Sequence, residues 1–128
     1  MRSEKSTKPG VSDAPSMISA EILKGKRKMV KHIILWKLKE NFSDAEKKEI
    51  KSGIKAGLEG LKGIIPGLEE ISVKIEGLPS SNADLMLDSS FVDEAALKNY
   101  AVHPAHVEVA NTKVRPFTEQ RLCLDFEE

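Results

Sequence analysis

One stretch of this sequence, residues 30–38, constrains the fold more than any other because it is apolar on both sides. It is rich in β-branched and aromatic residues, which is typical of a strand. Side chains alternate between the two faces of a strand, so one face carries Ile34, Trp36 and Leu38 and the other carries Ile33 and Leu35. Such a strand needs cover on both faces. The sequence therefore predicts a sheet with helices on one face and a partner on the other.

A helix is predicted directly after this strand. Ser43 suits the N-cap position, and Glu46 follows three residues later, which is the spacing of a capping box. Apolar residues then recur at helical spacing and predict one buried stripe: Ile50, Ile54, Leu58, Leu61 and Ile65. Pro66 and Gly67 are expected to end the helix.

Four glycines form a second stripe along the same helix: Gly53, Gly57, Gly60 and Gly63. Each glycine inside a helix costs about 1 kcal/mol relative to alanine. Two interpretations stay open. The glycines allow close packing on the sheet or a fraying last turn, or they leave room for a ligand between helix and sheet.

The remaining residues predict three more strands and a broken helix. Strands are expected at residues 68–76, 83–91 and 118–126, and an amphipathic helix at residues 93–102. His103 followed by Pro104 interrupts that helix, and Pro104 can begin the next helical turn.

The predicted order is β-α-β-β-α-β, a ferredoxin-like α+β unit with a four-stranded antiparallel sheet. Its helices would cover one face of the sheet only. A second copy is the natural cover for the other face, so we expect a homodimer whose two sheets form a dimeric α+β barrel.

Charge separates the two ends of the chain. Residues 1–28 hold seven Lys or Arg and three Asp or Glu, which leaves 13 and 17 for residues 29–128. We expect residues 1–28 to be a flexible N-terminal extension or an added leader, and residues 29–128 to be the folded domain. Because the domain itself is acidic, nucleic acid is not an expected partner.

The sequence contains no apolar run long enough to span a membrane and no secretory signal, so neither a membrane partner nor export is expected. A cytoplasmic location follows by default. Cys123 is the only cysteine, and its flanking leucines predict a structural, partly buried thiol.

Three motifs resemble the stress-responsive A/B barrel (Dabb) domain family, and they occur in family order. They are MVKHIILWKL from Met29 to Leu38, IPGL from Ile65 to Leu68, and YAVHPAH from Tyr100 to His106. The resemblance covers residues 29–128 and implies a homodimeric barrel. Members of this family include stress-induced proteins and a plant branch that cyclises polyketides.

The resemblance also implies a site. A tyrosine and a histidine of the third motif form the catalytic pair of the plant cyclase, and they match Tyr100 and His106 here. His32 matches a pocket histidine of that branch, whereas Leu85 stands where the cyclase has a further histidine. We expect a pocket lined by His32, Ile34, Trp36, Ile54, Leu58 and His103.

Two functions follow from this reading. The chain is a stress-associated dimer with a small hydrophobic ligand pocket, or it is a cofactor-independent cyclase, lyase or isomerase acting on a hydrophobic carbonyl compound through Tyr100 and His106. A third possibility is that these residues only stabilise the turn. His103 and His106 have His-x-x-His spacing, but no third ligand is evident, so neither a metal nor a cofactor is predicted.

Overall fold

A computed structural model describes residues 29–128, which form one antiparallel sheet and a layer of helices. The strands are β1 (Val30–Leu38), β2 (Leu68–Lys74), β3 (Leu85–Phe91) and β4 (Thr118–Glu127), in the spatial order β2-β3-β1-β4. The helices are α2 (Asp44–Glu59), α3 (Glu94–Val102) and α4 (Pro104–Val109). A π-helical turn, η1 (Ala110–Val114), and a 3-10 turn, η2 (Arg115–Phe117), lead into β4. The ferredoxin-like order predicted from the sequence is confirmed. The expected extension, residues 1–28, lies outside the described residues.

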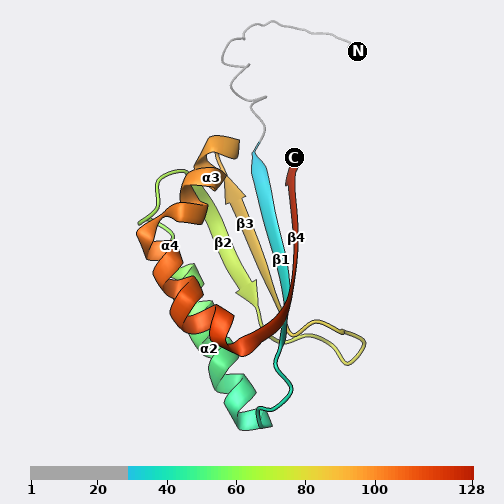
Figure 1. The fold of residues 1–128 in the computed structure, drawn as a ribbon. Coiled ribbons are helices and arrows are strands. Elements are labelled where there is room, and N and C mark those ends of the chain that lie inside the picture. The colour runs from blue at the N-terminus through green and yellow to red at the C-terminus, as the bar shows by residue number, and fades with distance from the viewer. Residues whose placement is uncertain (1–28) are drawn as a thin grey trace, which may run out of the picture.

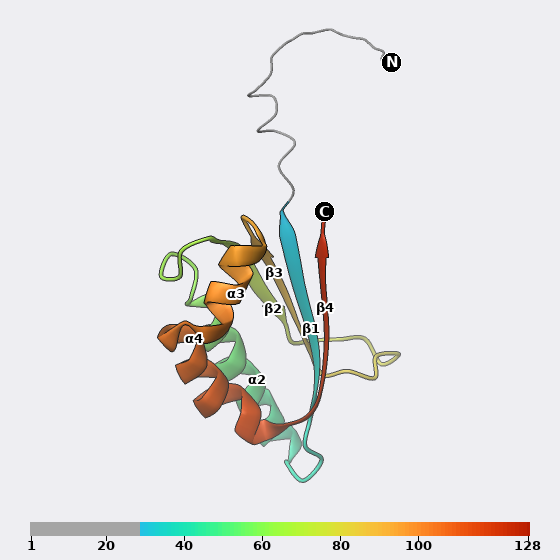
Figure 2. The same cartoon turned by 45° about the horizontal axis from the view of Figure 1, so that its top comes forward.

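All of the helices pack on one face of the sheet, and the opposite face is open (Figures 1 and 2). β1 lies between β3 and β4. On the helix side every second residue of β1 from Val30 to Leu38 is buried, whereas Leu35 on the open side is 38% exposed. In the part of the chain that the structure describes, no helix is long and apolar enough to cross a bilayer.

The start of α2 follows the prediction from the sequence. The Ser43 side chain accepts from the Glu46 backbone N–H at 3.1 Å, and the Glu46 carboxylate accepts from the Ser43 N–H at 2.8 Å. The predicted end is wrong, because α2 ends at Glu59 with Gly60 as its C-cap. The chain then runs through turns to Ile65, and Gly63 adopts a φ of +88° that breaks the helical path.

The glycine stripe does not open a space between α2 and the sheet. A Cβ at Gly57 would lie 3.0 Å from a methyl carbon of Val109, so this glycine lets α4 pack closely on α2. A Cβ at Gly53 would meet no atom within 4 Å. Close packing is therefore the better interpretation at Gly57, although the contact is between helices and not between helix and sheet.

The break between α3 and α4 sets the geometry of the site. Asp93 caps α3, because its carboxylate accepts from the Ala96 N–H at 2.8 Å. His103 has an extended backbone and caps α4, because its Nδ1 accepts from the Ala105 N–H at 3.1 Å. Pro104 occupies the first turn of α4, where its missing N–H costs nothing.

Candidate ligand site

An inner cavity of about 80 Å³ lies between the helix side of the sheet and the segment from α3 to β4. Its apolar walls come from β1, α2, β3 and η1, and they are formed by Ile34, Trp36, Leu58, Leu87, Ala110 and Val114. All six side chains are buried. This part of the lining can accept hydrocarbon, and the indole N–H of Trp36 is a hydrogen-bond donor.

The rest of the lining of the inner cavity is polar. These side chains come from five elements, and they are His32, Tyr100, His106, Arg115, Thr118 and Arg121. The Thr118 hydroxyl already donates to the Val114 carbonyl at 3.1 Å. The remaining five side chains carry the chemistry of the site.

Tyr100 places an unsatisfied hydroxyl in this cavity. The residue is 1% exposed, and its ring packs edge-on against Phe91 with 4.9 Å between centroids. Its hydroxyl is buried and has no hydrogen-bond partner among the described residues. Burial raises the pKa of the phenol well above its ordinary value, so Tyr100 stays protonated and remains a donor.

His106 lies beside Tyr100, with 4.2 Å between the ring centroids. Its Nδ1 is 3.3 Å from the Ala101 carbonyl oxygen, which can only accept, so Nδ1 carries the hydrogen. Burial lowers the pKa of this imidazole, and the charges of Arg115, His32 and Arg121 lower it further against the opposing effect of the Ala101 contact. His106 is therefore neutral near pH 7, and its Nε2 carries a free lone pair.

His32 links the inner cavity to the edge of the sheet. It is 8% exposed, and its ring lies edge-on to Tyr100 at 6.0 Å. Asp125 sits directly across from it on β4, and His32 Nδ1 donates to Asp125 Oδ1 at 2.5 Å. This pair fixes the orientation of the imidazole.

Cys123 lies beside that pair, but it is exposed, so the predicted partial burial is wrong. The reason is that β4 is an edge strand that the helices do not reach. Partial desolvation of the sulfur atom and the adjacent Asp125 carboxylate, which accepts from the thiol at 3.4 Å, raise the pKa of the thiol and keep it protonated near pH 7.

Within residues 29–128, one group of side chains has atoms close enough to share a metal: His32, Cys123 and Asp125. Two zinc ligands about 2 Å from the ion lie roughly 3.3 Å apart in a tetrahedral site. The His32 and Asp125 atoms are only 2.5 Å apart, which is hydrogen-bond geometry. As placed, these residues form a hydrogen-bonded cluster and not a ligand set.

An outer groove of about 560 Å³ adjoins the cavity between α3 and β4. It is lined by Leu97, Lys98 and Ala101 on one side and by Cys123 and Asp125 on the other. His32 and Arg121 line both hollows. The groove can therefore accommodate the part of a ligand that exceeds the small inner cavity.

The structure brings most of the predicted site residues together. Tyr100 and His106 line the inner cavity, as do His32, Ile34, Trp36 and Leu58. Ile54 and His103 do not. Ile54 is buried in the core, and the Nδ1 of His103 is used in the cap of α4.

The prediction missed Arg115, Arg121 and Asp125. The last two lie on β4, on the face opposite to Leu122, Leu124 and Phe126. Period-two alternation along residues 118–126 would have indicated which of these side chains share a face with His32.

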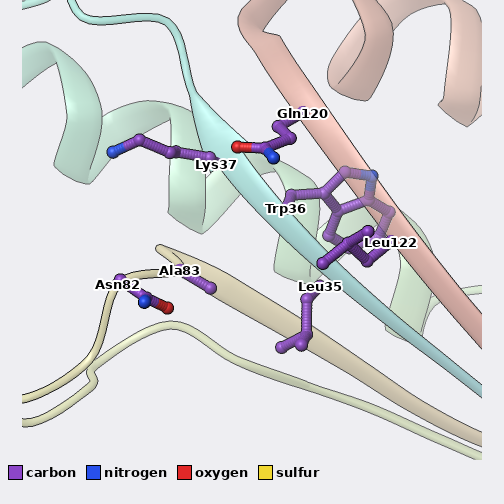
Figure 3. Close-up of a pocket in the computed structure, with 7 residues that line it drawn as sticks. All are labelled: Leu35, Trp36, Lys37, Asn82, Ala83, Gln120 and Leu122. Carbon is purple, nitrogen blue, oxygen red and sulfur yellow. The ribbon is translucent and has the colours of Figure 1, made fainter.

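A third hollow, of about 370 Å³, lies near the end of β1 and the start of β4 (Figure 3). Leu35 and Lys37 of β1 and Gln120 and Leu122 of β4 contribute to it, together with the loop before β3. It contains no acid, histidine or cysteine. It offers surface for association and no evident chemistry.

The family model described as the stress responsive A/B barrel domain matches residues 30–128. A solved dimeric protein of unknown function with a ferredoxin-like fold, from Bacteroides fragilis, is 32% identical. That match covers 78% of this chain and 96% of the other, with a TM-score of 0.74.

Two more distant structures share the fold. A Dabb family protein from Mesorhizobium loti is 23% identical over 77% of this chain and 95% of the other, with a TM-score of 0.60. The hydroxynitrile lyase from Passiflora edulis is 20% identical over 80% of this chain and 94% of the other, with a TM-score of 0.62. No curated protein sequence matches the chain significantly.

Proposed function

This chain belongs to the stress-responsive A/B barrel domain family, and on that premise we propose that it is a homodimer that binds a small carbonyl compound in its inner cavity. The observation that carries the ligand proposal is the buried, unpartnered hydroxyl of Tyr100. An unsatisfied buried hydroxyl costs about 1–3 kcal/mol. A carbonyl oxygen would accept its hydrogen bond and remove that cost.

The remaining walls favour a ligand with a hydrocarbon part. Trp36 and Leu58 contribute apolar surface to the lining of the cavity. Burying a ligand methylene there contributes about 0.8 kcal/mol. A small, mostly apolar molecule with one acceptor oxygen fits this lining.

The dimer proposal rests on the open face of the sheet. Leu35, Leu122, Leu124 and Phe126 are 38%, 61%, 64% and 39% exposed there, on two neighbouring strands. An apolar patch of this kind marks an interaction surface. The relative from Bacteroides fragilis, 32% identical, is described as dimeric, which favours a second copy as the cover.

A second candidate function, cofactor-independent catalysis, is favoured by the protonation states of Tyr100 and His106. A neutral imidazole can take a proton from the carbon next to a carbonyl, while a phenol donates to the developing enolate oxygen. One fold neighbour, from Passiflora edulis, is a hydroxynitrile lyase, so the fold supports an enzyme in at least one case.

Binding and chemistry are tested separately with 2-butanone and the full chain. Ligand-observed NMR titration measures binding, and exchange of the ketone's α-protons in heavy water measures proton abstraction. Tyr100→Phe is expected to weaken binding at least about fivefold, since a hydrogen bond contributes about 1 kcal/mol. Lys113→Gln, which alters an exposed side chain of η1 that does not line the inner cavity, is the control.

Catalysis by Tyr100 and His106 predicts a second result. Wild type should accelerate exchange, and His106→Gln should slow it about 10²–10⁴-fold without unfolding the chain. An effect below about threefold would rule out His106 as the base and leave a binding protein. If 2-butanone does not bind wild type, the ligand proposal itself is wrong.

A further inference from the structure

We propose that the inner cavity selects an anionic carbonyl compound, a small keto acid whose carboxylate is bound by Arg115 and Arg121 while its keto oxygen accepts from Tyr100. This inference rests on the proposed ligand-binding function and names the class of ligand for that same site.

The lining of the inner cavity is positively charged. Two arginines line the inner cavity, and no Asp or Glu does so. The nearest acid among the contacts of the lining residues is Asp125, which accepts from His32 Nδ1 at 2.5 Å. The lining of the inner cavity therefore has an excess of positive charge and of hydrogen-bond donors, and Asp125 beside it is already paired with His32.

Both arginines are available to bind a carboxylate of the ligand. Neither Arg115 nor Arg121 forms a salt bridge with another residue of the described domain. Arg115 donates one hydrogen bond to the Asn111 side chain, which uses only part of its guanidinium. A guanidinium has five N–H donors in a planar fork that matches a carboxylate in two-point contact.

The two arginines and Tyr100 reach the cavity from different parts of the fold. Arg115 lies in η2, Arg121 on β4 and Tyr100 in α3, so three separate elements present donors to one cavity. Both arginine charges act on His106 and lower its pKa, which means that they lie within range of the pair that would bind the keto group. A molecule with a keto oxygen at one end and a carboxylate at the other can contact Tyr100 and the two arginines at the same time.

The volume of the inner cavity limits the size of the ligand. A water-sized group needs roughly 10–15 Å³ of such space, so a cavity of about 80 Å³ accommodates only a handful of non-hydrogen atoms. A short keto acid has this size. Longer ligands would extend past His32 and Arg121 into the outer groove, which those two residues also line.

The test compares two probes of nearly equal shape, acetoacetate and 2,4-pentanedione, which differ by a carboxylate oxygen in place of a methyl group. Their dissociation constants are measured with the full chain by ligand-observed NMR in a buffer without phosphate. Acetoacetate is expected to bind wild type at least about tenfold more tightly, because charge-assisted bonds are roughly twice as strong as neutral ones.

Substitutions then locate the effect. Arg121→Gln and Arg115→Gln should each weaken acetoacetate about tenfold and leave 2,4-pentanedione unchanged, whereas Arg121→Lys should recover part of the loss. Lys113→Gln is the matched control, because Lys113 is an exposed cation of η1 that does not line the inner cavity. It should alter neither probe. Circular dichroism checks that each variant is folded.

The outcomes separate this inference from the function on which it rests. Equal binding of the two probes, or arginine variants that match the Lys113 control, would overturn the anionic ligand while the carbonyl-binding function stands. If Tyr100→Phe weakens neither probe, or if neither probe binds wild type, both proposals fail.

Discussion

Among the buried side chains of residues 29–128, the hydroxyl of Tyr100 is the polar group without a hydrogen-bond partner. Ser89 is also fully buried, yet its hydroxyl donates to the His32 carbonyl at 2.8 Å. Buried polar groups are nearly always paired in this way, and an unpaired one calls for an explanation. The two hydroxyls therefore allow a direct comparison of structural and functional roles.

Removing the Tyr100 hydroxyl should not destabilise the protein. We expect Tyr100→Phe to leave the free energy of unfolding unchanged or to raise it by up to about 1 kcal/mol, because an unsatisfied group is deleted. Ser89→Ala, which deletes a satisfied group, should lower it by about 0.5–1.5 kcal/mol. Urea unfolding of both variants measures the difference. A loss of about 1–3 kcal/mol in Tyr100→Phe would instead show that the hydroxyl supports the fold.

The lowered pKa of His106 makes stability depend on pH. Unfolding returns this imidazole to its ordinary pKa near 6.5, so the unfolded chain binds more protons below that pH. The contribution of neutral His106 is therefore complete above about pH 6.5 and is lost as the pH falls through that value toward the folded pKa. His106→Gln should lose less stability than wild type between about pH 7 and about pH 5.

Urea midpoints measured across this range would check the prediction. His106→Asn, which also removes the imidazole, should behave as His106→Gln does. Parallel pH curves for wild type and His106→Gln would contradict the prediction.

At the scale of elements, the break between α3 and α4 is what creates the site. In a continuous helix, residues six apart are separated by about 600° of rotation, so Tyr100 and His106 would point to different sides. The extended backbone of His103 and the proline after it redirect the chain. As a result the two rings stack at 4.2 Å.

Two glycines of α2 should respond oppositely to alanine. Gly53→Ala adds a methyl group in open space, so helix propensity should stabilise the protein by about 0.5–1 kcal/mol. Gly57→Ala places the same group 3.0 Å from Val109, and the clash should cancel or reverse that gain. Thermal unfolding of the two variants provides the measurement. Equal stabilisation by both would show that α4 does not pack as described.

Local signals in the sequence predicted where most elements begin, although β3 begins at Leu85 and not at residue 83. The Ser43 and Glu46 pair located the start of α2, and the alternation in residues 30–38 gave β1 and its two faces. The end of α2 was missed because the apolar stripe continues to Ile65, and Ile65 is indeed buried, although the chain there is no longer helical. A periodic pattern predicts which side chains are buried, but it does not predict the conformation of the backbone that buries them.

The polar part of the lining was harder to predict, because it depends on contacts between distant residues. His32 and Asp125 are 93 positions apart, and only the register of β1 against β4 brings them together. Arg115 lies in a 3-10 turn that no periodicity predicts. Tyr100 and His106 were found through their resemblance to a family motif, since their spacing alone gave no geometry.

At the scale of the whole molecule, the open face of the sheet leads to a prediction about assembly. Leu35→Glu should convert the proposed dimer into monomers, because an unpaired charge in a desolvated interface costs several kcal/mol. Light scattering across a range of protein concentrations measures the change. Val102→Glu is the control, since Val102 is 72% exposed at the end of α3, in the helix layer.

The control variant should keep the mass of wild type. If wild type itself is monomeric at micromolar concentration, the dimer proposal fails whatever the variants do. Loss of the dimer together with a large loss of folded protein would show that the chain depends on its partner for stability.

Alternate residues of β4 point to the two faces of the sheet. Arg121, Cys123 and Asp125 belong to the site or its rim, whereas Leu122, Leu124 and Phe126 lie on the open face. Any association that immobilises the second set also immobilises the first. Thermodynamic linkage then requires that any effect of the partner on ligand affinity is matched by an equal effect of the ligand on association. The affinity for ligand would depend on the concentration of the protein itself, so abundance would act as an effector of this chain.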